Sequence, residues 1–452
     1  MHDLVVRNGT VVTPLSAQKL DIGIDGEAIS ALGNGLDGHH VLDAEGMLVF
    51  PGIIDAHTHM QLPVGGTRSS DDFYTGSVAA AFGGVTSIID FTVGSPRSSI
   101  SVDIERRLDE IEPSVVDVGL HAEVVGWNPE DSGQFTEARR RGVTSFKFYT
   151  AYESSGRRTK PAIMRQAFAH LADLDCLALV HCEDEDLIRS IMQALTVEQL
   201  ADMSTLARAR PDLCEATAIS QVGKVAAETG CRTHIVHLSS AKGLMAVQEA
   251  RKTGAAMTAE TCPQYLVLGA DSYDRMDGHL FSASPALRAS TDQTFLWTGL
   301  RNRSIDFVAT DHCPFTREQK AWRGSFTDLP YGLPGVETLL PILYSEGVAK
   351  GRLSVNDIPR LLSEGPAQTY GLDGYKGAIE IGMDADLVIF DPSLEWKIAS
   401  TFLHMRTDFS PYEGWRMKGK ALSTVSRGEI IVHDGQLLAQ EGRGKFLFRD
   451  LP

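Results

Sequence analysis

The middle of the chain alternates short apolar runs with segments in which apolar residues recur at helical spacing. The apolar runs are typical of buried strands and cover residues 48–54, 85–91, 116–124, 143–149, 176–182, 232–238, 256–261 and 305–310. The helical segments include residues 162–174, 215–229 and 241–253, and Gly or Pro stands near their ends. Eight strands that alternate with helices favour an α/β fold, a (β/α)8 TIM barrel, over an open sheet.

Both ends of the chain have a different pattern, with short strand-like runs separated by tight turns. Near the N-terminus these runs cover residues 4–6, 9–13 and 21–27, and Asp25-Gly26 is a hairpin signal. Near the C-terminus they cover residues 385–391 and 423–436. We therefore predict that residues 1–50 and 380–452 form one small β-sandwich domain beside a barrel domain of residues 51–379.

Composition limits the classes of partner. Of the 452 residues, 43% are hydrophobic and 22% are charged, as in ordinary globular proteins, and the formal net charge is -17. Proteins that bind the phosphate backbone of nucleic acids present basic surfaces, so this negative charge argues against a nucleic-acid partner.

The sequence predicts neither a secretory signal nor a membrane span. The first residues lack a basic stretch followed by a long apolar core, and no stretch approaches the roughly 18 apolar residues of a membrane helix. The six cysteines are scattered and form no Cys-x-x-Cys pair. In a chain of this size they are typical of reduced thiols, which predicts a cytoplasmic location. The lack of a long apolar stretch predicts no membrane partner.

The pair His57 and His59 is the first candidate for chemistry. It ends the run Val49-Phe-Pro-Gly-Ile-Ile-Asp-Ala-His-Thr-His. Because side chains alternate along a strand, two histidines one residue apart point to the same side. They bring two neutral imidazoles to one point at the C-terminal end of the strand, as a divalent metal requires.

Polar residues recur at the ends of other predicted strands, namely Lys147, His181, His237 and Asp311. A single histidine between apolar residues is more often a hydrogen-bonded core residue than a ligand. Four histidines and an aspartate at corresponding strand ends are hard to explain that way. In a barrel, this end of the strands is the face that carries the active site. The sequence therefore predicts a metal site.

Lys147 has two interpretations. An ammonium group among these ligands repels a cation, and burying it unpaired costs several kcal/mol. Lys147 can be a barrel-lining lysine that pairs with Asp311. Alternatively, its amine reacts with carbon dioxide to form a carbamate, an anionic oxygen ligand able to bridge two metal ions. The residues alone do not choose between the two.

Several motifs resemble those of a known family. The run that begins Pro51-Gly-Ile-Ile-Asp-Ala-His-Thr-His, with the later strand-end ligands, resembles the amidohydrolase superfamily. The closer resemblance is to the hydantoinase/dihydropyrimidinase family, over essentially the whole chain. It is carried by Asp71-Asp-Phe-Tyr-Thr-Gly, Gly142-Val-Thr-Ser-Phe-Lys-Phe-Tyr-Thr-Ala-Tyr, Ser284-Pro-Ala-Leu-Arg, Thr310-Asp-His-Cys-Pro-Phe and Ser410-Pro-Tyr-Glu-Gly.

This resemblance implies a binuclear zinc hydrolase that opens the ring amide of 5-substituted hydantoins or dihydropyrimidines to N-carbamoyl amino acids. It also implies a homotetramer, or a homodimer. One zinc ion is held by His57, His59 and Asp311 and the second by His181 and His237, and carboxylated Lys147 and a hydroxide bridge the two. A metal pair of this kind lowers the pKa of the shared water and positions it against the ring carbonyl.

The resemblance also assigns roles around the metals. Asp311 takes the proton of the nucleophile and passes it to the departing nitrogen. Tyr152 donates a hydrogen bond to the developing oxyanion. The backbone of Ser284 holds the ring amide. Leu62 and Tyr149 line the pocket for the exocyclic substituent of the ring, and an apolar or aromatic substituent suits them.

Two positions bear on the alternatives. Dihydroorotases have an arginine for the substrate's carboxylate where this chain has Gln61, which disfavours that activity. Tyr331 replaces an asparagine of the family whose backbone contacts the ring, and it can narrow the pocket. Allantoinase remains the alternative within the class. A non-catalytic relative of dihydropyrimidinase, which acts as a scaffold, is the alternative outside it, but such relatives lack the metal ligands that this chain retains.

Overall fold

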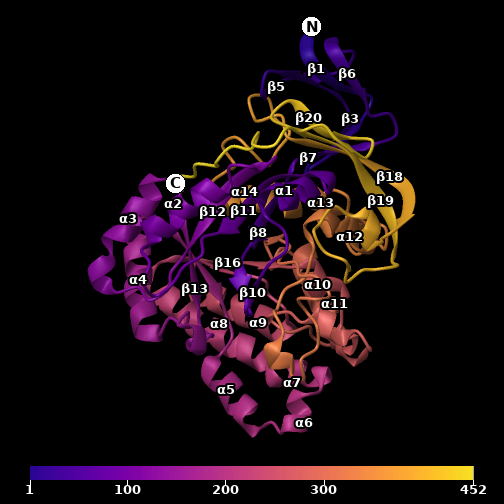
Figure 1. The fold of residues 1–452 in the computed structure, drawn as a ribbon. Helices are drawn as coiled ribbons and strands as arrows, with labels where there is room; N and C mark the ends of the chain where they lie inside the picture. Colours follow the sequence, from indigo (N-terminus) through magenta and orange to yellow (C-terminus); the bar gives the residue numbers. More distant parts are fainter. Residues whose placement is uncertain (451–452) are drawn as a thin grey trace.

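The computed structural model describes residues 1–450, and a parallel barrel forms its centre (Figure 1). Its eight strands lie side by side in the order of the sequence. They are β8 (Ile53–Thr58), β11 (Val85–Phe91), β12 (Asp117–Glu123), β13 (Ser145–Tyr149), β14 (Leu177–His181), β15 (Arg232–Ile235), β16 (Met257–Thr261) and β17 (Phe307–Val308). A parallel bridge between Thr58 and His312 joins the two ends of this sheet. The predicted (β/α)8 barrel is confirmed.

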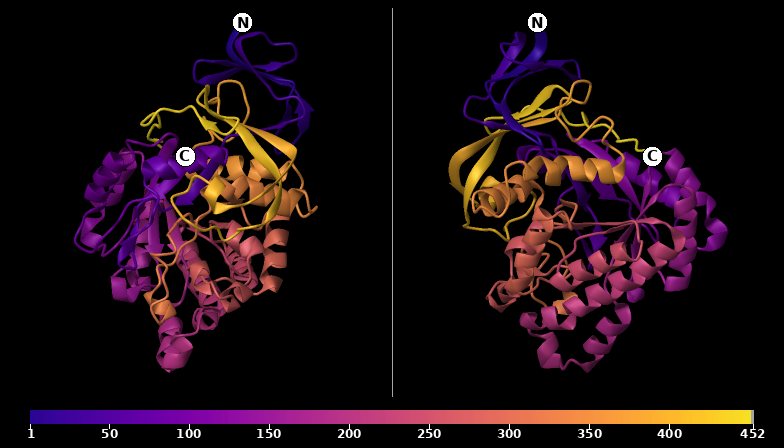
Figure 2. Two further views of the ribbon diagram at one scale, coloured as in Figure 1. Left: turned by 45° about the vertical axis from the view of Figure 1, so that its right-hand side comes forward. Right: turned by 180° about the vertical axis from the view of Figure 1, so that it is seen from behind.

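Helices follow the strands and surround the barrel, as the two further views show (Figure 2). The helices predicted at residues 162–174, 215–229 and 241–253 correspond to α4, α8 and α9. The helices are α1 (Phe73–Phe82), α2 (Ile100–Glu110), α3 (Gly133–Arg140), α4 (Pro161–Asp173), α5 (Glu185–Ala194), α6 (Val197–Leu200), α7 (Leu206–Ala209), α8 (Asp212–Thr229), α9 (Ala241–Lys252), α10 (Pro263–Val267), α11 (Ser290–Arg301), α12 (Leu339–Ile342), α13 (Asp357–Pro359) and α14 (Gly365–Tyr370). Within residues 1–450 no helix combines the length and the apolar character needed to cross a membrane.

The two ends of the chain form the β-sandwich beside the barrel, where indigo and yellow strands meet (Figure 2). One sheet has the order β5 (Ala28–Gly33), β4 (Asp21–Asp25), β1 (His2–Arg7) and β6 (Gly38–Asp43). The other has the order β21 (Gln436–Leu437), β20 (Glu429–His433), β19 (Arg416–Ser426), β18 (Leu387–Lys397), β7 (Leu48–Pro51), β2 (Thr10–Val12) and β3 (Ala17–Lys19). The hairpin signal at Asp25-Gly26 is confirmed, because β4 and β5 pair there in antiparallel register.

The predicted strand at residues 48–54 is not one strand. Its first part is β7, which pairs with β18 in the β-sandwich, and the next residues begin β8 of the barrel. The chain changes sheets at Gly52. A Cβ atom there would lie 2.2 Å from the hydroxyl oxygen of Thr86 and 2.7 Å from the Cβ of Asp386. The continuous apolar pattern hid this crossing because both sheets bury the segment.

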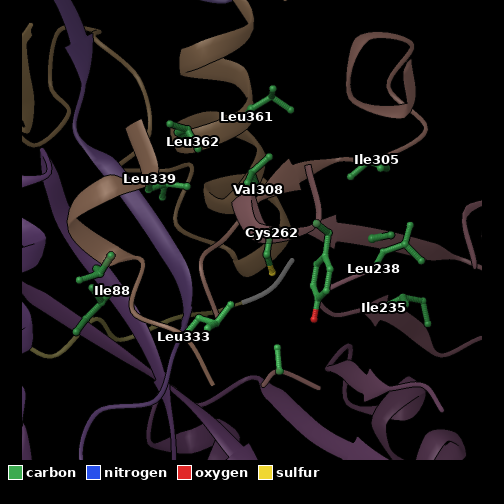
Figure 3. Close-up of a cluster of buried hydrophobic side chains, with 14 of the residues drawn as sticks. Ile88, Ile235, Leu238, Cys262, Ile305, Val308, Leu333, Leu339, Leu361 and Leu362 are labelled. Carbon is green, nitrogen blue, oxygen red and sulfur yellow. The ribbon is translucent and has the colours of Figure 1, made fainter. Parts of the chain in front are cut away.

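Apolar side chains fill the space between the barrel strands and the surrounding helices. Figure 3 shows Leu238, Cys262 and Val308 in this cluster, with leucines from the segments near α12 and α14. Close packing of this kind fixes the strands, and therefore the ends of the strands where the polar residues stand. A separate cluster, which includes Leu4, Ile22 and Leu387, fills the β-sandwich.

A buried ion cluster joins the β-sandwich to the barrel. The ammonium of Lys376 lies 2.9 Å from Asp117, 2.9 Å from Asp384 and 2.7 Å from Asp386. Three carboxylates this close could hold a cation, but here the lysine ammonium supplies the positive charge. Arg427 adds a second contact to Asp117 at 3.1 Å. The cluster is therefore structural.

Candidate active site and metal centre

The strand ends bring the predicted metal ligands together at one mouth of the barrel. His57 lies in β8 and His59 directly follows it; Lys147 lies in β13 and His181 ends β14. His237 and Asp311 lie just beyond β15 and β17, and their backbone φ angles are 41° and 53°. Left-handed backbone is uncommon for residues other than glycine and is concentrated at functional sites. Here it turns both side chains away from the strand direction and toward the other ligands.

His57, His59 and Asp311 form one group. The Nε2 atom of His59 lies 3.1 Å from Oδ1 of Asp311, and the Nε2 atom of His57 lies 3.3 Å from the same oxygen. The three possible ligand atoms lie within 4.8 Å of one another. Nε2 of His57 and Nδ1 of His59 are buried without a hydrogen-bond partner among the described residues. Such orphaned nitrogens are rare in folded proteins, and they fit a site for a cation.

His181 and His237 form a second group. Nδ1 of His181 lies 2.9 Å from Nε2 of His237, so ring nitrogens of both residues converge on one point. The His237 ring also lies 5.5 Å from the His57 ring, measured between centroids, which places the two groups side by side. The arrangement fits two cation positions next to each other.

Burial keeps the imidazoles in the form that binds metals. It lowers the pKa of His57 and of His181, and it lowers the pKa of His237 well below the ordinary value. For Asp311, burial acts to raise the pKa, but the imidazoles of His57 and His59 outweigh it and hold the pKa below the usual value. Neutral imidazoles and an ionised carboxylate are the ligand forms that zinc and similar ions require.

Lys147 is not paired with Asp311. No carboxylate of residues 1–450 lies within 4.0 Å of its ammonium, and Asp311 pairs with histidines instead. The ammonium lies 5.0 Å from the ring centre of Phe91 and 5.4 Å from that of Tyr149. Burial lowers the pKa of Lys147 to about 8, which increases the fraction of neutral amine at physiological pH.

Two glutamates hold the histidines from behind, and the sequence analysis missed both. Glu260, in β16, contacts Nδ1 of His57 and accepts from Nε2 of His234 at 3.3 Å. Glu183 accepts from Nε2 of His181 at 2.9 Å and is itself held by Arg210. Carboxylates that orient metal-binding histidines have this position. The signal for Glu260 was a carboxylate inside an apolar strand, and for Glu183 a carboxylate two residues after a candidate ligand.

A cavity of about 690 Å³ opens over these groups. Its lining includes all the residues that sequence analysis assigned to substrate: Leu62, Tyr149, Tyr152, Ser284 and Tyr331. The hydroxyl of Tyr152 lies 2.5 Å from the hydroxyl oxygen of Ser284, and the Tyr152 ring lies 4.9 Å from the His181 ring. The left-handed backbone of Tyr152 (φ 69°) turns this side chain back over the strand ends.

Tyr331 and Gln61 differ in how they relate to the cavity. The hydroxyl of Tyr331 donates to the backbone oxygen of Phe326 at 3.1 Å, which fixes the ring in the cavity wall. Gln61 does not belong to the residues that line the cavity, and its backbone N–H bonds to Asp71 at 2.6 Å. The side chain at position 61 therefore offers the cavity no charge.

Other side chains of metal-binding type lie near these groups, but their contacts or protonation do not suit metal binding. His312 turns away from the cluster: its Nε2 lies 3.1 Å from Asp71, and its Nδ1 accepts from the N–H of Gly335 at 3.0 Å. Cys182, Cys262 and Cys313 are buried free thiols, and burial raises the pKa of each well above its ordinary value. A protonated thiol is a poor metal ligand.

Comparison with known proteins gives consistent matches along the chain. Residues 48–431 match the profile of the family described as the Amidohydrolase family. A D-hydantoinase from Geobacillus stearothermophilus is 35% identical over 98% of this chain and 96% of its own length. A D-phenylhydantoinase from Escherichia coli (strain K12 / DH10B) is 37% identical over 99% of this chain and 98% of its own length.

Solved structures agree with these sequence matches. The crystal structure of dihydropyrimidinase from Brevibacillus agri NCHU1002 superposes with a TM-score of 0.96 at 34% identity. The superposition covers 99% of this chain and 98% of that one. The likeness therefore extends over both the barrel and the β-sandwich.

Proposed function

Because this chain belongs to the amidohydrolase family and is a hydrolase of the hydantoinase/dihydropyrimidinase kind that acts on cyclic amides, we propose that its substrates are 5-substituted hydantoins and dihydropyrimidines. It opens the ring amide to give N-carbamoyl amino acids. The observation that carries this proposal is the convergence of four histidines, Asp311 and the unpaired Lys147 beneath one cavity.

The metal-dependent chemistry of the family needs a cation site, and the residues present fit one. His57, His59 and Asp311 would hold one zinc ion, and His181 and His237 a second. Lys147 as a carbamate would supply the bridging ligand, which its burial without a carboxylate partner among the described residues supports. When bound, the two zinc ions supply the Lewis acidity that lowers the pKa of a water molecule and polarises the ring carbonyl.

Asp311 moves the proton. Its carboxylate lies at the cavity floor beside His57 and His59, with a pKa held below the ordinary value, so that it is ionised and able to accept. It takes the proton of the attacking water, the water oxygen bonds to the ring carbonyl carbon, and the carbon–nitrogen bond breaks. The same proton then goes to the departing nitrogen, as general base and acid catalysis requires.

Tyr152 and Ser284 orient the ring and stabilise charge. The phenol of Tyr152 is a hydrogen-bond donor at the edge of the cavity, and burial raises its pKa to about 12, which keeps it protonated. It donates to the carbonyl oxygen as negative charge develops there. The backbone of Ser284 accepts from the ring N–H, and the backbone at Tyr331 closes the opposite side of the ring.

The alternative activity is that of an allantoinase, which opens a hydantoin ring with a ureido substituent. Dihydroorotase activity is less well supported, because Gln61 stands at the position where dihydroorotases have the arginine for the substrate's carboxylate. A scaffold without catalysis is disfavoured, because the complete ligand set has no structural use. We further propose a homotetramer or homodimer and a cytoplasmic location, the latter supported by six unpaired thiols in residues 1–450.

A substrate panel with metal analysis tests the proposal. The purified enzyme, loaded with zinc and bicarbonate, is assayed with dihydrouracil, both enantiomers of an aryl- and an alkyl-hydantoin, allantoin and dihydroorotate. We expect about two zinc ions per chain and ring opening of hydantoins. Less than one zinc per chain together with no ring opening contradicts the proposal. If the enzyme turns over allantoin or dihydroorotate preferentially, that compound takes the place of hydantoins and dihydropyrimidines as the proposed substrate.

A further inference from the structure

One wall of the active-site cavity carries an arginine that the reaction does not use. After Tyr152 the chain makes a short turn over η2 (Glu153–Ser155) and returns alongside β13, where Arg158 forms a bridge with Tyr149. Neighbouring residues of an extended segment point in opposite directions. Arg158 accordingly points outward, to Asp186 at 2.7 Å. Arg157 points the other way and lines the cavity.

A buried carboxylate fixes Arg157 from behind. Its Nε atom lies 3.5 Å from Oε1 of Glu123, whose side chain is 3% exposed. Glu123 also accepts from the hydroxyl of Tyr149 and from the backbone N–H of Gly94 at 2.7 Å. The carboxylate is therefore fully engaged, and it holds two cavity-lining side chains in place at once.

The terminal nitrogens of Arg157 are left free for a ligand. Neither Nη atom makes a hydrogen bond or an ion pair with any of residues 1–450, and the side chain is 25% exposed, toward the cavity. A guanidinium in this position presents a planar set of donors that matches a carboxylate or carbonyl oxygen. An apolar group placed against it would remove its water without replacing the hydrogen bonds.

The cavity wall has an apolar part and a polar part that share a carboxylate. Leu62 and Tyr149 offer an apolar side chain and an aromatic face, and Arg157 stands beside the Tyr149 hydroxyl, with Glu123 between them. A substituent on the ring can therefore meet both apolar surface and the guanidinium within the same cavity. The sequence expectation of an apolar or aromatic substituent therefore describes only part of this pocket.

We propose that Arg157 determines specificity by binding a hydrogen-bond-accepting oxygen, of a carboxylate or of a carboxamide, at the outer end of the substituent on ring carbon 5. The inference rests on the proposed ring-opening function and names the substrate class within it. A hydrogen bond to a charged group that is lost or gained in this way corresponds to about a 10- to 100-fold change in kcat/KM.

The test compares hydantoins of matched shape, each as separate enantiomers. The substituents are carboxyethyl, carbamoylethyl and isoamyl, of which the last has the branched shape of the amide without its oxygen acceptor. We expect at least one acceptor-bearing compound to exceed the isoamyl compound by about tenfold or more in kcat/KM. Comparison of the carboxyethyl with the carbamoylethyl compound separates the contribution of charge from that of hydrogen bonding, because both have an oxygen acceptor and only the first is charged.

Substitutions at Arg157 and Arg158 test which residue causes the preference for acceptor-bearing substituents. In Arg157→Leu the ratio between the acceptor-bearing and isoamyl compounds falls to about one, and in Arg157→Lys part of it remains. Arg158→Leu is the matched control, because it removes the adjacent arginine from the outer side and leaves the ratio unchanged. Because the readout is a ratio within each variant, partial loss of folded enzyme does not alter it.

Two outcomes overturn the inference. If the wild-type enzyme opens the isoamyl hydantoin as fast as both acceptor-bearing compounds, it has no preference for a substituent with an oxygen acceptor. If the ratio of kcat/KM between acceptor-bearing and isoamyl hydantoins is unchanged in Arg157→Leu, the preference comes from another residue. In both cases ring opening still takes place, so the proposed function stands. Absence of ring opening with all the compounds, unsubstituted hydantoin included, is instead the failure of the proposed function itself.

Discussion

The carboxylate of Glu260 contacts the Nδ1 atom of His57, and neither side chain is accessible to solvent. This contact fixes which nitrogen of the imidazole carries the proton. With Nδ1–H donated to Glu260, the lone pair of Nε2 faces Asp311 and the centre of the site. The contact with Glu260 therefore holds the buried imidazole of His57 in the tautomer that can bind a cation.

Glu260→Gln is predicted to weaken metal binding by about 10- to 100-fold, because loss of an orienting carboxylate typically has that effect. Retained zinc after dialysis against a graded chelator measures it. Glu337→Gln is the matched control, since Glu337 is also a buried glutamate on a histidine, His404, but lies outside the cavity. Equal zinc retention in both variants would refute the orienting role of Glu260.

Tyr152→Phe is predicted to lower kcat by about 100- to 1,000-fold with a much smaller change in KM, as for the loss of one oxyanion donor. The phenyl ring keeps its place beside His181, and only the hydroxyl that contacts Ser284 is lost. Steady-state kinetics with an unsubstituted hydantoin measure the split. Tyr375→Phe, which loses a hydroxyl contact to Phe448 away from the cavity, serves as the control. A change confined to KM argues for a binding role alone.

Lys147→Ala is predicted to lose both the bridged metal pair and activity, because the variant has no amine to carboxylate. A short carboxylic acid added in solution can occupy the vacated space and restores part of the rate. Zinc content and rate are measured with and without the acid. Asp311→Asn gives the contrast: it lacks the group that carries the proton, so the same acid gives no rescue. Two zinc ions and full rate in Lys147→Ala exclude the carbamate bridge.

Lys320 is predicted to make stability depend on pH. Its ammonium is buried, bonded to the backbone oxygen of Ser282 at 2.9 Å and to the Ser282 hydroxyl at 2.8 Å, without a carboxylate partner in residues 1–450. Burial lowers the pKa of Lys320 from 10.5 to about 7. Between these two pH values the unfolded chain binds more protons at this amine, so the folded state gains stability as the pH rises.

The stability that the folded state gains from Lys320 is complete above the pKa of the lysine in the unfolded chain. This stability is lost as the pH falls toward 7. In Lys320→Met this pH dependence is absent. Thermal unfolding midpoints at constant ionic strength, from about pH 7 to about pH 10, are compared between the variant and wild type. Lys252→Met removes an exposed lysine as the control. Wild-type and Lys320→Met midpoints that run parallel across this range contradict the prediction.

The sequence was sufficient to predict the barrel and the positions of its polar strand ends. Buried parallel strands are near-continuous apolar runs, and a predicted ligand such as His181 or His237 interrupts that pattern visibly. Left-handed backbone at His237 and Asp311 was not visible in the sequence, because it is imposed by the connections beyond the strands. The same continuity of apolar residues concealed the change of sheet at Gly52.

What the sequence could not supply are contacts between residues far apart in the chain. Glu260 of β16 meets His57 of β8 although the two lie 203 positions apart in the chain, and Glu123 meets Arg157 only because the segment after Tyr152 folds back. The absence of a carboxylate partner for Lys147 among residues 1–450 is likewise a property of the assembled barrel. Residue types predicted the kind of chemistry, whereas the partners that tune it followed only from the fold.

The change of sheet at Gly52 has a consequence for how the protein matures during synthesis. β8 pairs early with the nearby β11, but β7 has a neighbour in β18 and β8 reaches its closing bridge only at His312, so the sheets around His57 are completed by residues translated much later. Contacts of such long sequence separation form late. A chain that ends before His312 therefore lacks this closing bridge, and one that ends before Asp311 also lacks a member of the predicted ligand cluster.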